Sequence, residues 1–194
     1  MTISPRSTPG DRADRTAPSA GTVPRPRPAM DDTPDLRPGT DGDSPATGWL
    51  RPTGRVPAVL SAWGHGVLAE VPTGIAWDVV RVPSELGPDT VRRLRATRAP
   101  LGPVLTTPLG TDFVVAPGSA DGWAVTGTSV LGRGTLVLLP PPETVEPRRV
   151  GSRGWLVAPD GRGTLTRAAD LRDAYTEALS AAAAAQESAA VEPA

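Results

Sequence analysis

The chain has 194 residues, a formal net charge of -1 and no cysteine. The missing cysteines exclude disulfides, thiolate metal sites and cysteine nucleophiles, and the near-zero charge provides no global field that would attract nucleic acid or an anionic membrane. His65 is the one histidine, which excludes a centre built from several, and no apolar stretch approaches the ~20 residues of a membrane span. We therefore expect no membrane partner, and without an apolar leader the expected compartment is the cytoplasm.

Residues 1–46 form the first segment, which we expect to be a disordered arm. Proline recurs throughout it and large apolar side chains are almost absent, so the arm buries too little surface to offset the entropy of ordering. The run PRPRP at 24–28 favours polyproline II. It fits either a docking motif for a proline-recognising protein partner or a solvated linker.

Residues 47–163 form the predicted globular domain, which begins where Trp49 and Leu50 appear. Apolar runs that end at glycine and proline predict short strands. We expect strands at 67–71, 76–83, 103–107, 112–117, 134–142 and 154–159. The strand at 134–142 is expected to be buried, with Trp77 and Leu138 among the core positions, and one helical turn is expected around Trp123.

A helix is predicted after the second strand. Gly87 and Pro88 open it, Asp89 lies near the positive end of its dipole, and the glycine and proline at 100–102 stop it. The side chains of Val91 and Leu94 and the stem of Arg98 are expected to face the core, which leaves its other arginines facing outward.

The arginines of this helix are the candidate nucleic-acid-binding residues: Arg92, Arg93, Arg95 and Arg98. Because the net charge is near zero, a solvated helix face is the competing interpretation of this cluster. The five tryptophans also allow two interpretations, since they fit either base stacking or an aromatic core. They are Trp49, Trp63, Trp77, Trp123 and Trp155.

Residues 164–194 are predicted to form a C-terminal Ala-rich helix and tail. Thr166 is a candidate cap, and apolar residues recur at helical spacing from there on. These residues are Leu171, Tyr175, Ala178, Leu179 and Ala182. The pattern leaves open whether the helix packs on the domain or projects from it as a contact for a protein partner.

Motifs of common enzyme classes are missing. His65 lies in WGHG with no visible orienting partner, so a loop or half-buried position is favoured over a general base. No serine lies in a Gly-x-Ser-x-Gly elbow. The sequence LGRGT at 131–135 precedes a predicted strand rather than a helix, which favours a turn over a phosphate-binding loop.

Four pieces of the chain, taken in order, resemble a known family: VPTGIAWDVVRVPSELG, APLGPVLTTPLGTDFVVAPGSA, LGRGTLVLLPPP and RGWLVAP. Residues 71–159 are similar to the small actinobacterial proteins related to the N-terminal domain of bifunctional DNA primase/polymerases. The resemblance implies an α/β fold of the α+β type, with a single small mixed sheet and flanking helices. In active members this sheet carries metal-binding carboxylates and a nucleotide-contacting histidine for phosphoryl transfer.

The chain departs from the active pattern at each of these positions. Arg81, Val82 and Pro83 stand where an active member has Asp-x-Asp, residues 108–112 replace Ser-Gly-Gly-x-His, and no acidic residue falls in register near Gly127. We therefore assign no catalytic residue, no metal ligand and no cofactor, and Mg²⁺ enters only if catalysis is retained.

Three hypotheses follow. The first is an inactive primase/polymerase-like domain, related to DNA replication, that acts as a binding or regulatory module and keeps contact with nucleic acid or nucleotide. The second is an adaptor with no nucleic-acid role, whose proline-rich arm and C-terminal helix contact a protein partner. The third is an active polymerase with relocated metal ligands, for instance Asp78 with Asp112.

Overall fold

The computed structural model describes residues 45–146 and 148–191. The predicted disordered arm at 1–46 lies outside this range except for its last two residues. These two begin the short helix α1 (Pro45–Gly48), which is followed by a 3₁₀ turn, η1 (Arg51–Thr53). The helix α2 (Val56–Gly64) comes next. It is not among the elements expected from the sequence, although Pro57 at its first turn is a signal for a helix start.

The centre of the fold is a five-stranded sheet. Its strands are β2 (Asp78–Val82), β3 (Val104–Thr107), β4 (Gly110–Val115), β5 (Ser129–Leu131) and β7 (Gly154–Val157). They lie in the order β5-β2-β4-β3-β7, and every neighbouring pair is antiparallel. The fold is thus of the predicted α+β type, and the sheet, which the resemblance implied to be mixed, is antiparallel.

A second, two-stranded sheet pairs β1 (Ala69–Pro72) with β6 (Leu136–Leu139), also antiparallel. The expectation that β6 is wholly buried is wrong. Leu136 is 52 % exposed and Leu138 is half-buried, whereas Val137 and Leu139 are buried. Because β6 pairs with a single strand and has solvent on one face, its residues alternate between core and solvent.

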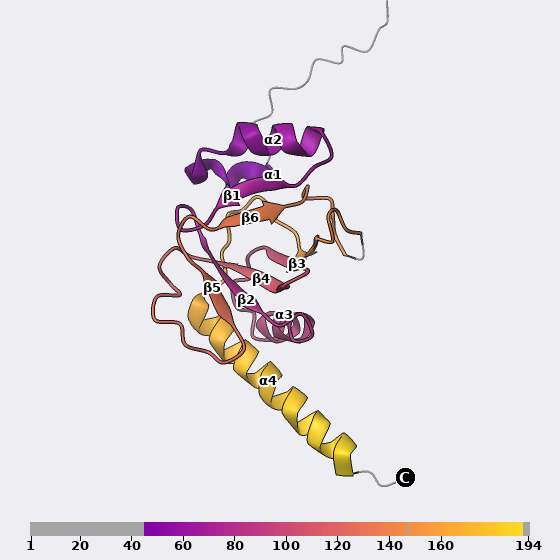
Figure 1. Cartoon of the computed structure of the whole chain (residues 1–194). Helices are drawn as coiled ribbons and strands as arrows, with labels where there is room; N and C mark the ends of the chain where they lie inside the picture. Colours follow the sequence, from indigo (N-terminus) through magenta and orange to yellow (C-terminus); the bar gives the residue numbers. More distant parts are fainter. Residues whose placement is uncertain (1–44, 147, 192–194) are drawn as a thin grey trace, which may run out of the picture. The chain divides into compact units, whose positions relative to one another are not determined.

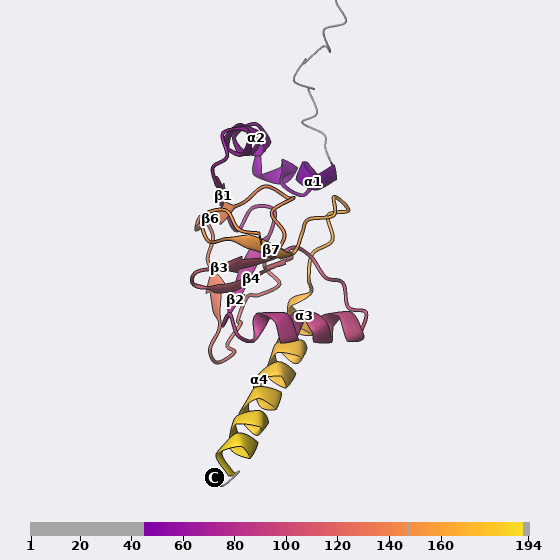
Figure 2. The same cartoon turned by 90° about the vertical axis from the view of Figure 1, so that its right-hand side faces the viewer.

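The elements form layers, as Figures 1 and 2 show. The sheet β1-β6 and helices α1 and α2 cover one face of the five-stranded sheet. Helices α3 (Gly87–Ala96) and α4 (Ala168–Val191) lie on the other face. Successive residues of a strand point to opposite faces, so β2 contributes Val79 to the first core and Val80 to the second.

Tryptophan dominates the core between the two sheets. The ring of Trp49 lies 5.4 Å from that of Trp77 and 6.2 Å from that of Trp155, measured between centroids. All three side chains are buried. These contacts make the aromatic core, rather than a base-stacking surface, the role of these three tryptophans.

Helix α3 begins and ends close to where the sequence predicts, and its buried Val91 and Leu94 face the second core. Gly87 is required at its start, because a Cβ atom there would lie 2.2 Å from the Oγ1 of Thr111. The prediction that the Arg98 stem faces inward is wrong. Arg98 is exposed and lies beyond the helix end, with a positive φ of 56°.

The segment between β4 and β5 contains turns and no helical turn, so the expectation of a helical turn at Trp123 is wrong. The amide of Trp123 donates to the carbonyl of Ala120 in a turn, and its Nε1 donates to the Oγ1 of Thr128 at 2.7 Å. Local hydrogen bonds of this kind satisfy the backbone without a helix.

The first half of helix α4 packs on the domain, and its second half extends into solvent. Leu171 and Tyr175 are fully buried against the sheet and α3, and Ala178 is also buried. Leu179 is 38 % exposed rather than facing the core, and residues 183–190 are all exposed. In the described ranges, no helix combines the length and the apolar character needed to cross a membrane.

Candidate functional site

Three segments that are far apart in sequence meet at one hollow of about 410 Å³, which we call the hairpin cleft. The end of β2 and the turn that follows it supply residues 81–85, and the β3-β4 turn supplies Pro108 and Leu109. The start of β5 with the preceding loop supplies 127–129. These are the three segments singled out in the sequence by the resemblance described above.

Antiparallel register explains why they meet. Val82 lies opposite Thr111 on β4, and Arg81 lies opposite both Asp112 on β4 and Ser129 on β5. The end of β2 is therefore flanked by the beginnings of both neighbouring strands, at one end of the sheet.

An ion pair between Arg81 and Asp112 is the central charged contact. The Nε of Arg81 donates to Oδ1 of Asp112 at 2.6 Å, and its Nη2 donates to Oδ2 at 2.8 Å. The side chain of Asp112 is 2 % exposed and that of Arg81 is 19 % exposed. Such a bidentate pair fixes both side chains in one orientation.

Burial raises the pKa of the Asp112 carboxyl, and the hydrogen bonds from Arg81 together with the positive charges of Arg81 and Arg153 oppose this rise. The hydrogen bonds to Asp112 raise the pKa of Arg81, against the effect of burial. Arg81 thus stays cationic at the position where the resemblance would place a metal ligand.

Helix α4 packs against the loop before β5, which is one of the three segments that line the cleft. The hydroxyl of Tyr175 donates to the carbonyl of Thr126 at 3.0 Å, and the guanidinium of Arg172 lies 5.3 Å from the ring centroid of Trp123. Gly127 has a φ of +76°, and a Cβ atom there would lie 2.9 Å from the Tyr175 hydroxyl. The loop and helix therefore fit closely at a conformation that favours glycine.

Carboxylates are scarce at the cleft. Glu85 is the one acidic residue in its lining, and no group of three or more metal-ligating side chains occurs within residues 45–146 and 148–191. The absence of a metal remains a prediction. Asp78 and Asp112 are not brought together, since Asp78 accepts from the amide of Gly118 on the opposite face of β2 from Arg81.

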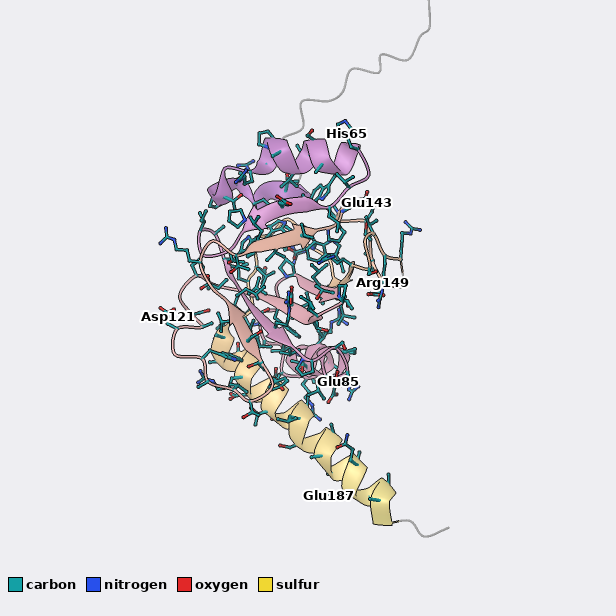
Figure 3. The ribbon with its side chains drawn as sticks, in the orientation of Figure 1. His65, Glu85, Asp121, Glu143, Arg149 and Glu187 are labelled. Atoms are coloured by element: carbon teal, nitrogen blue, oxygen red, sulfur yellow. The ribbon has the colours of Figure 1, made fainter. Side chains whose placement is uncertain are left out.

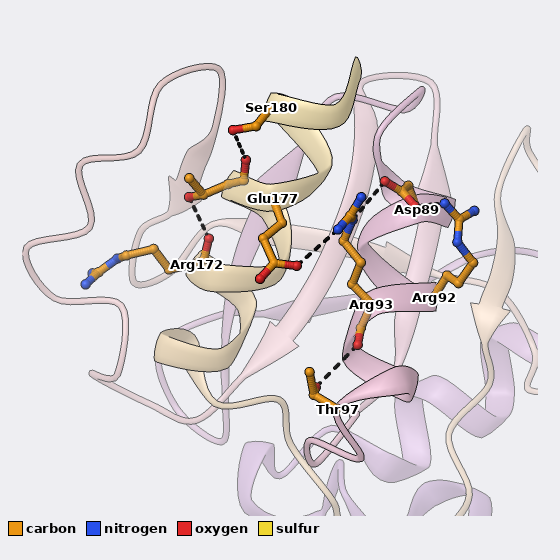
Figure 4. Close-up of polar contacts among 8 residues, drawn as sticks. Asp89, Arg92, Arg93, Thr97, Arg172, Glu177 and Ser180 are labelled. Atoms are coloured by element: carbon orange, nitrogen blue, oxygen red, sulfur yellow. Dashed lines mark hydrogen bonds and ion pairs between the residues drawn. The ribbon is translucent and has the colours of Figure 1, made fainter. Parts of the chain in front are cut away.

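The predicted arginine cluster lies on α3 and, for Arg98, just beyond its end, and it is outside the lining of the hairpin cleft. Figure 4 shows that Arg93 lies between Asp89 and Glu177 and so ties α3 to α4, with both N–O distances at 3.0 Å. Arg92 also pairs with Asp89. Arg95 and Arg98 are exposed and form no ion pair with another described residue, so they remain the freest candidates for a phosphate contact.

His65 lies far from the cleft. Figure 3 places it beside α2, while Glu85 lies beside α3 at the other side of the sheets. The Nδ1 of His65 is 2.7 Å from the carbonyl oxygen of Ser61, which belongs to the last turn of α2. His65 is exposed at the C-terminal end of α2, which fits the expected loop position rather than the half-buried one.

Sequence reasoning missed the Arg81–Asp112 pair. Arg81 and Asp112 each stand beside apolar residues of a predicted strand, and opposite charges on neighbouring strands favour pairing. Helix α3 and strand β3 separate β2 from β4 along the chain, so no turn in the sequence indicates that these two strands are neighbours.

Comparison with family models, with curated proteins and with solved structures found no match to this chain.

Proposed function

We propose that the chain is a primase/polymerase-like domain without catalytic activity, which binds single-stranded nucleic acid or nucleotide at the hairpin cleft. One observation carries this proposal. The three segments that the resemblance identifies with an active site line the same hollow, and an arginine–aspartate ion pair stands in place of the carboxylates.

The chemistry of the cleft favours binding over phosphoryl transfer. Two-metal catalysis requires carboxylates placed to hold a pair of divalent cations, whereas Arg81 repels such cations. The hydroxyl of Ser129 lines the cleft and can donate to a phosphate oxygen. The hydroxyls of Thr128 and Ser84 also line the cleft, but they donate to the carbonyl of Val125 and the carboxylate of Glu85. Arg95 on α3 and Arg98, just beyond the end of α3, extend the positive charge away from the cleft.

Tryptophan fluorescence provides the test of binding. Trp123 is hydrogen-bonded to the cleft-lining Thr128, so a strand in the cleft is expected to change its emission. Titration of the full chain with a single-stranded oligonucleotide should give a saturable change that weakens from low to moderate salt. The double variant R95Q/R98Q should bind more weakly, and R55Q, at the far helix α2, should bind like the wild type.

Primer extension in the presence of Mg²⁺ tests the absence of catalysis. We expect no template-dependent incorporation. Incorporation that is lost in Asp78→Ala and Asp112→Ala would overturn this part of the proposal and support relocated metal ligands.

A specific observation favours the adaptor as the second candidate. Residues 183–190 of α4 are exposed and extend beyond the packed part of the helix, which suits contact with a protein partner. Unchanged fluorescence at both salt concentrations would overturn nucleic-acid binding and leave the adaptor as the better account.

A further inference from the structure

A second cavity, of about 210 Å³, lies between the two sheets next to the hairpin cleft. We call it the inter-sheet cavity. Arg81, Thr107 and Asp112 line it from the five-stranded sheet, Leu136 lines it from β6, and Arg153 lines it from the residue before β7. Its volume is many times the ~10–15 Å³ that holds one water molecule, so a phosphate group fits inside.

The cavity carries an excess of positive charge. Its ionisable lining residues are Arg81, Asp112 and Arg153, so two cations face one carboxylate. Arg153 is close enough for its charge to lower the pKa of Asp112, against the larger effect of burial. Unbalanced charge in a half-buried space is unfavourable without a counter-charge, and the cavity therefore favours an anion.

Both arginines retain donors for such an anion. Asp112 occupies the Nε and Nη2 of Arg81, and the Nη1 of Arg153 donates to the carbonyl of Gly151 at 3.0 Å. Among the described residues, the Nη1 of Arg81 and the Nε and Nη2 of Arg153 have no hydrogen-bond partner. Donors that come from two separate guanidinium groups suit a phosphate, which offers three terminal oxygens, better than a flat carboxylate.

Apolar side chains border the same cavity. Leu109 is 72 % exposed and Leu136 is 52 % exposed. They provide a surface for an apolar group attached to the anion.

We infer that the inter-sheet cavity binds a small organic phosphate monoester, with the phosphate between Arg81 and Arg153 and the organic group against Leu109 and Leu136. The inter-sheet cavity shares Arg81 and Leu109 with the hairpin cleft. Arg153 lines the inter-sheet cavity alone, and the inference does not depend on strand binding at the hairpin cleft.

Calorimetric titration of the full chain in a phosphate-free buffer tests the inference, with phenyl phosphate, inorganic phosphate and benzoate as probes. Phenyl phosphate should bind most tightly, inorganic phosphate more weakly for lack of the apolar group, and benzoate weakest. Arg153→Gln should weaken phenyl phosphate binding at least about tenfold, the effect of losing a charged hydrogen bond. Arg153→Lys should recover part of it.

Arg133→Gln is the matched control, because Arg133 is exposed and lines a neighbouring hollow instead. It should bind phenyl phosphate like the wild type, and circular dichroism should show that all variants are folded. No binding of phenyl phosphate, or equal binding by Arg153→Gln and the wild type, would overturn the inference. Oligonucleotide binding that persists in that case would leave the proposed function standing.

Discussion

Asp112 forms the ion pair with Arg81 at the centre of the candidate site. Its carboxylate is nearly fully buried and holds Arg81 in a bidentate contact between the hairpin cleft and the inter-sheet cavity. Because a buried ion pair has offsetting desolvation and Coulomb energies, its presence does not predict a large net stabilisation. Removal of one partner lowers the stability, because the other charge then remains buried without a counter-charge.

We therefore expect Asp112→Asn to lower the free energy of unfolding by about 2–3 kcal/mol, less than for a fully buried pair because Arg81 is 19 % exposed. Urea denaturation measures this. In the double variant Arg81→Met/Asp112→Asn the loss should be smaller than the sum of the two single losses. Additive losses would show that the two side chains do not interact in solution.

Tyr175 gives the chain an unusual response to alkali. Burial raises the pKa of its hydroxyl, and the negative charge of Glu85 adds to the rise. The chain has one tyrosine, no cysteine and no lysine. From about pH 9 to about 12, Tyr175 is thus the one side chain that titrates.

The sign of the effect follows from linkage. Above about pH 10 the unfolded chain has lost a proton that the native protein still holds, so the free energy of unfolding falls as the pH rises toward the raised native pKa. Tyr175→Phe should remove this fall and should lower stability at neutral pH by about 0.5–1.5 kcal/mol through the lost hydrogen bond to Thr126. Denaturation at neutral and alkaline pH, with tyrosinate absorbance as a direct readout, checks both. Equal alkaline losses in the two proteins would contradict the assignment.

At the scale of elements, Trp77, which directly precedes β2, is fully buried, whereas Leu138 on β6 is half-buried. Trp77→Ala should lower the free energy of unfolding by about 3–5 kcal/mol, because its ring packs against Trp49 in the core. Leu138→Ala should cost about 1 kcal/mol, because that side chain is half-buried. Chemical denaturation of the two variants gives the comparison. A larger loss for Leu138→Ala would show that β6 is covered in solution.

The elements that the sequence predicts well are those with local signals. The helix at Gly87 has proline and an acidic residue in its first turn, and the β3-β4 hairpin has a proline–leucine–glycine turn between two apolar runs. Strand β5 and helix α2 have weaker local signals. The three residues of β5 are stabilised by pairing with β2, and α2 by burial of Val56 and Val59, so both depend on contacts that become visible only once the chain is folded.

In the candidate site, too, local features were visible in the sequence and long-range contacts were not. The resemblance singled out three separate segments of the sequence, and the register of β2 against β4 and β5 brings these segments to one cleft. The proposed arginines of α3 were found by their charge, but Arg93 and Arg92 bind acidic neighbours. Long-range ion pairs such as Arg93–Glu177 are not readable from local spacing.

At the scale of the whole molecule, α4 has two parts with different roles. Its first turns bury Leu171 and Tyr175 and hold the cleft wall, while residues 183–190 contact solvent. Truncation after Ala182 should therefore leave the melting temperature nearly unchanged, whereas truncation before Leu171 should unfold the domain, because it opens the second core. Thermal denaturation followed by circular dichroism measures both.

The same truncation separates the two proposed functions. A chain that ends at Ala182 keeps every residue that lines the hairpin cleft, so oligonucleotide binding should persist with an unchanged dissociation constant. An adaptor that uses the projecting helix should lose its protein partner instead. Loss of oligonucleotide binding in a truncated chain that is still folded would show that the projecting residues, rather than the cleft, carry the strand contact.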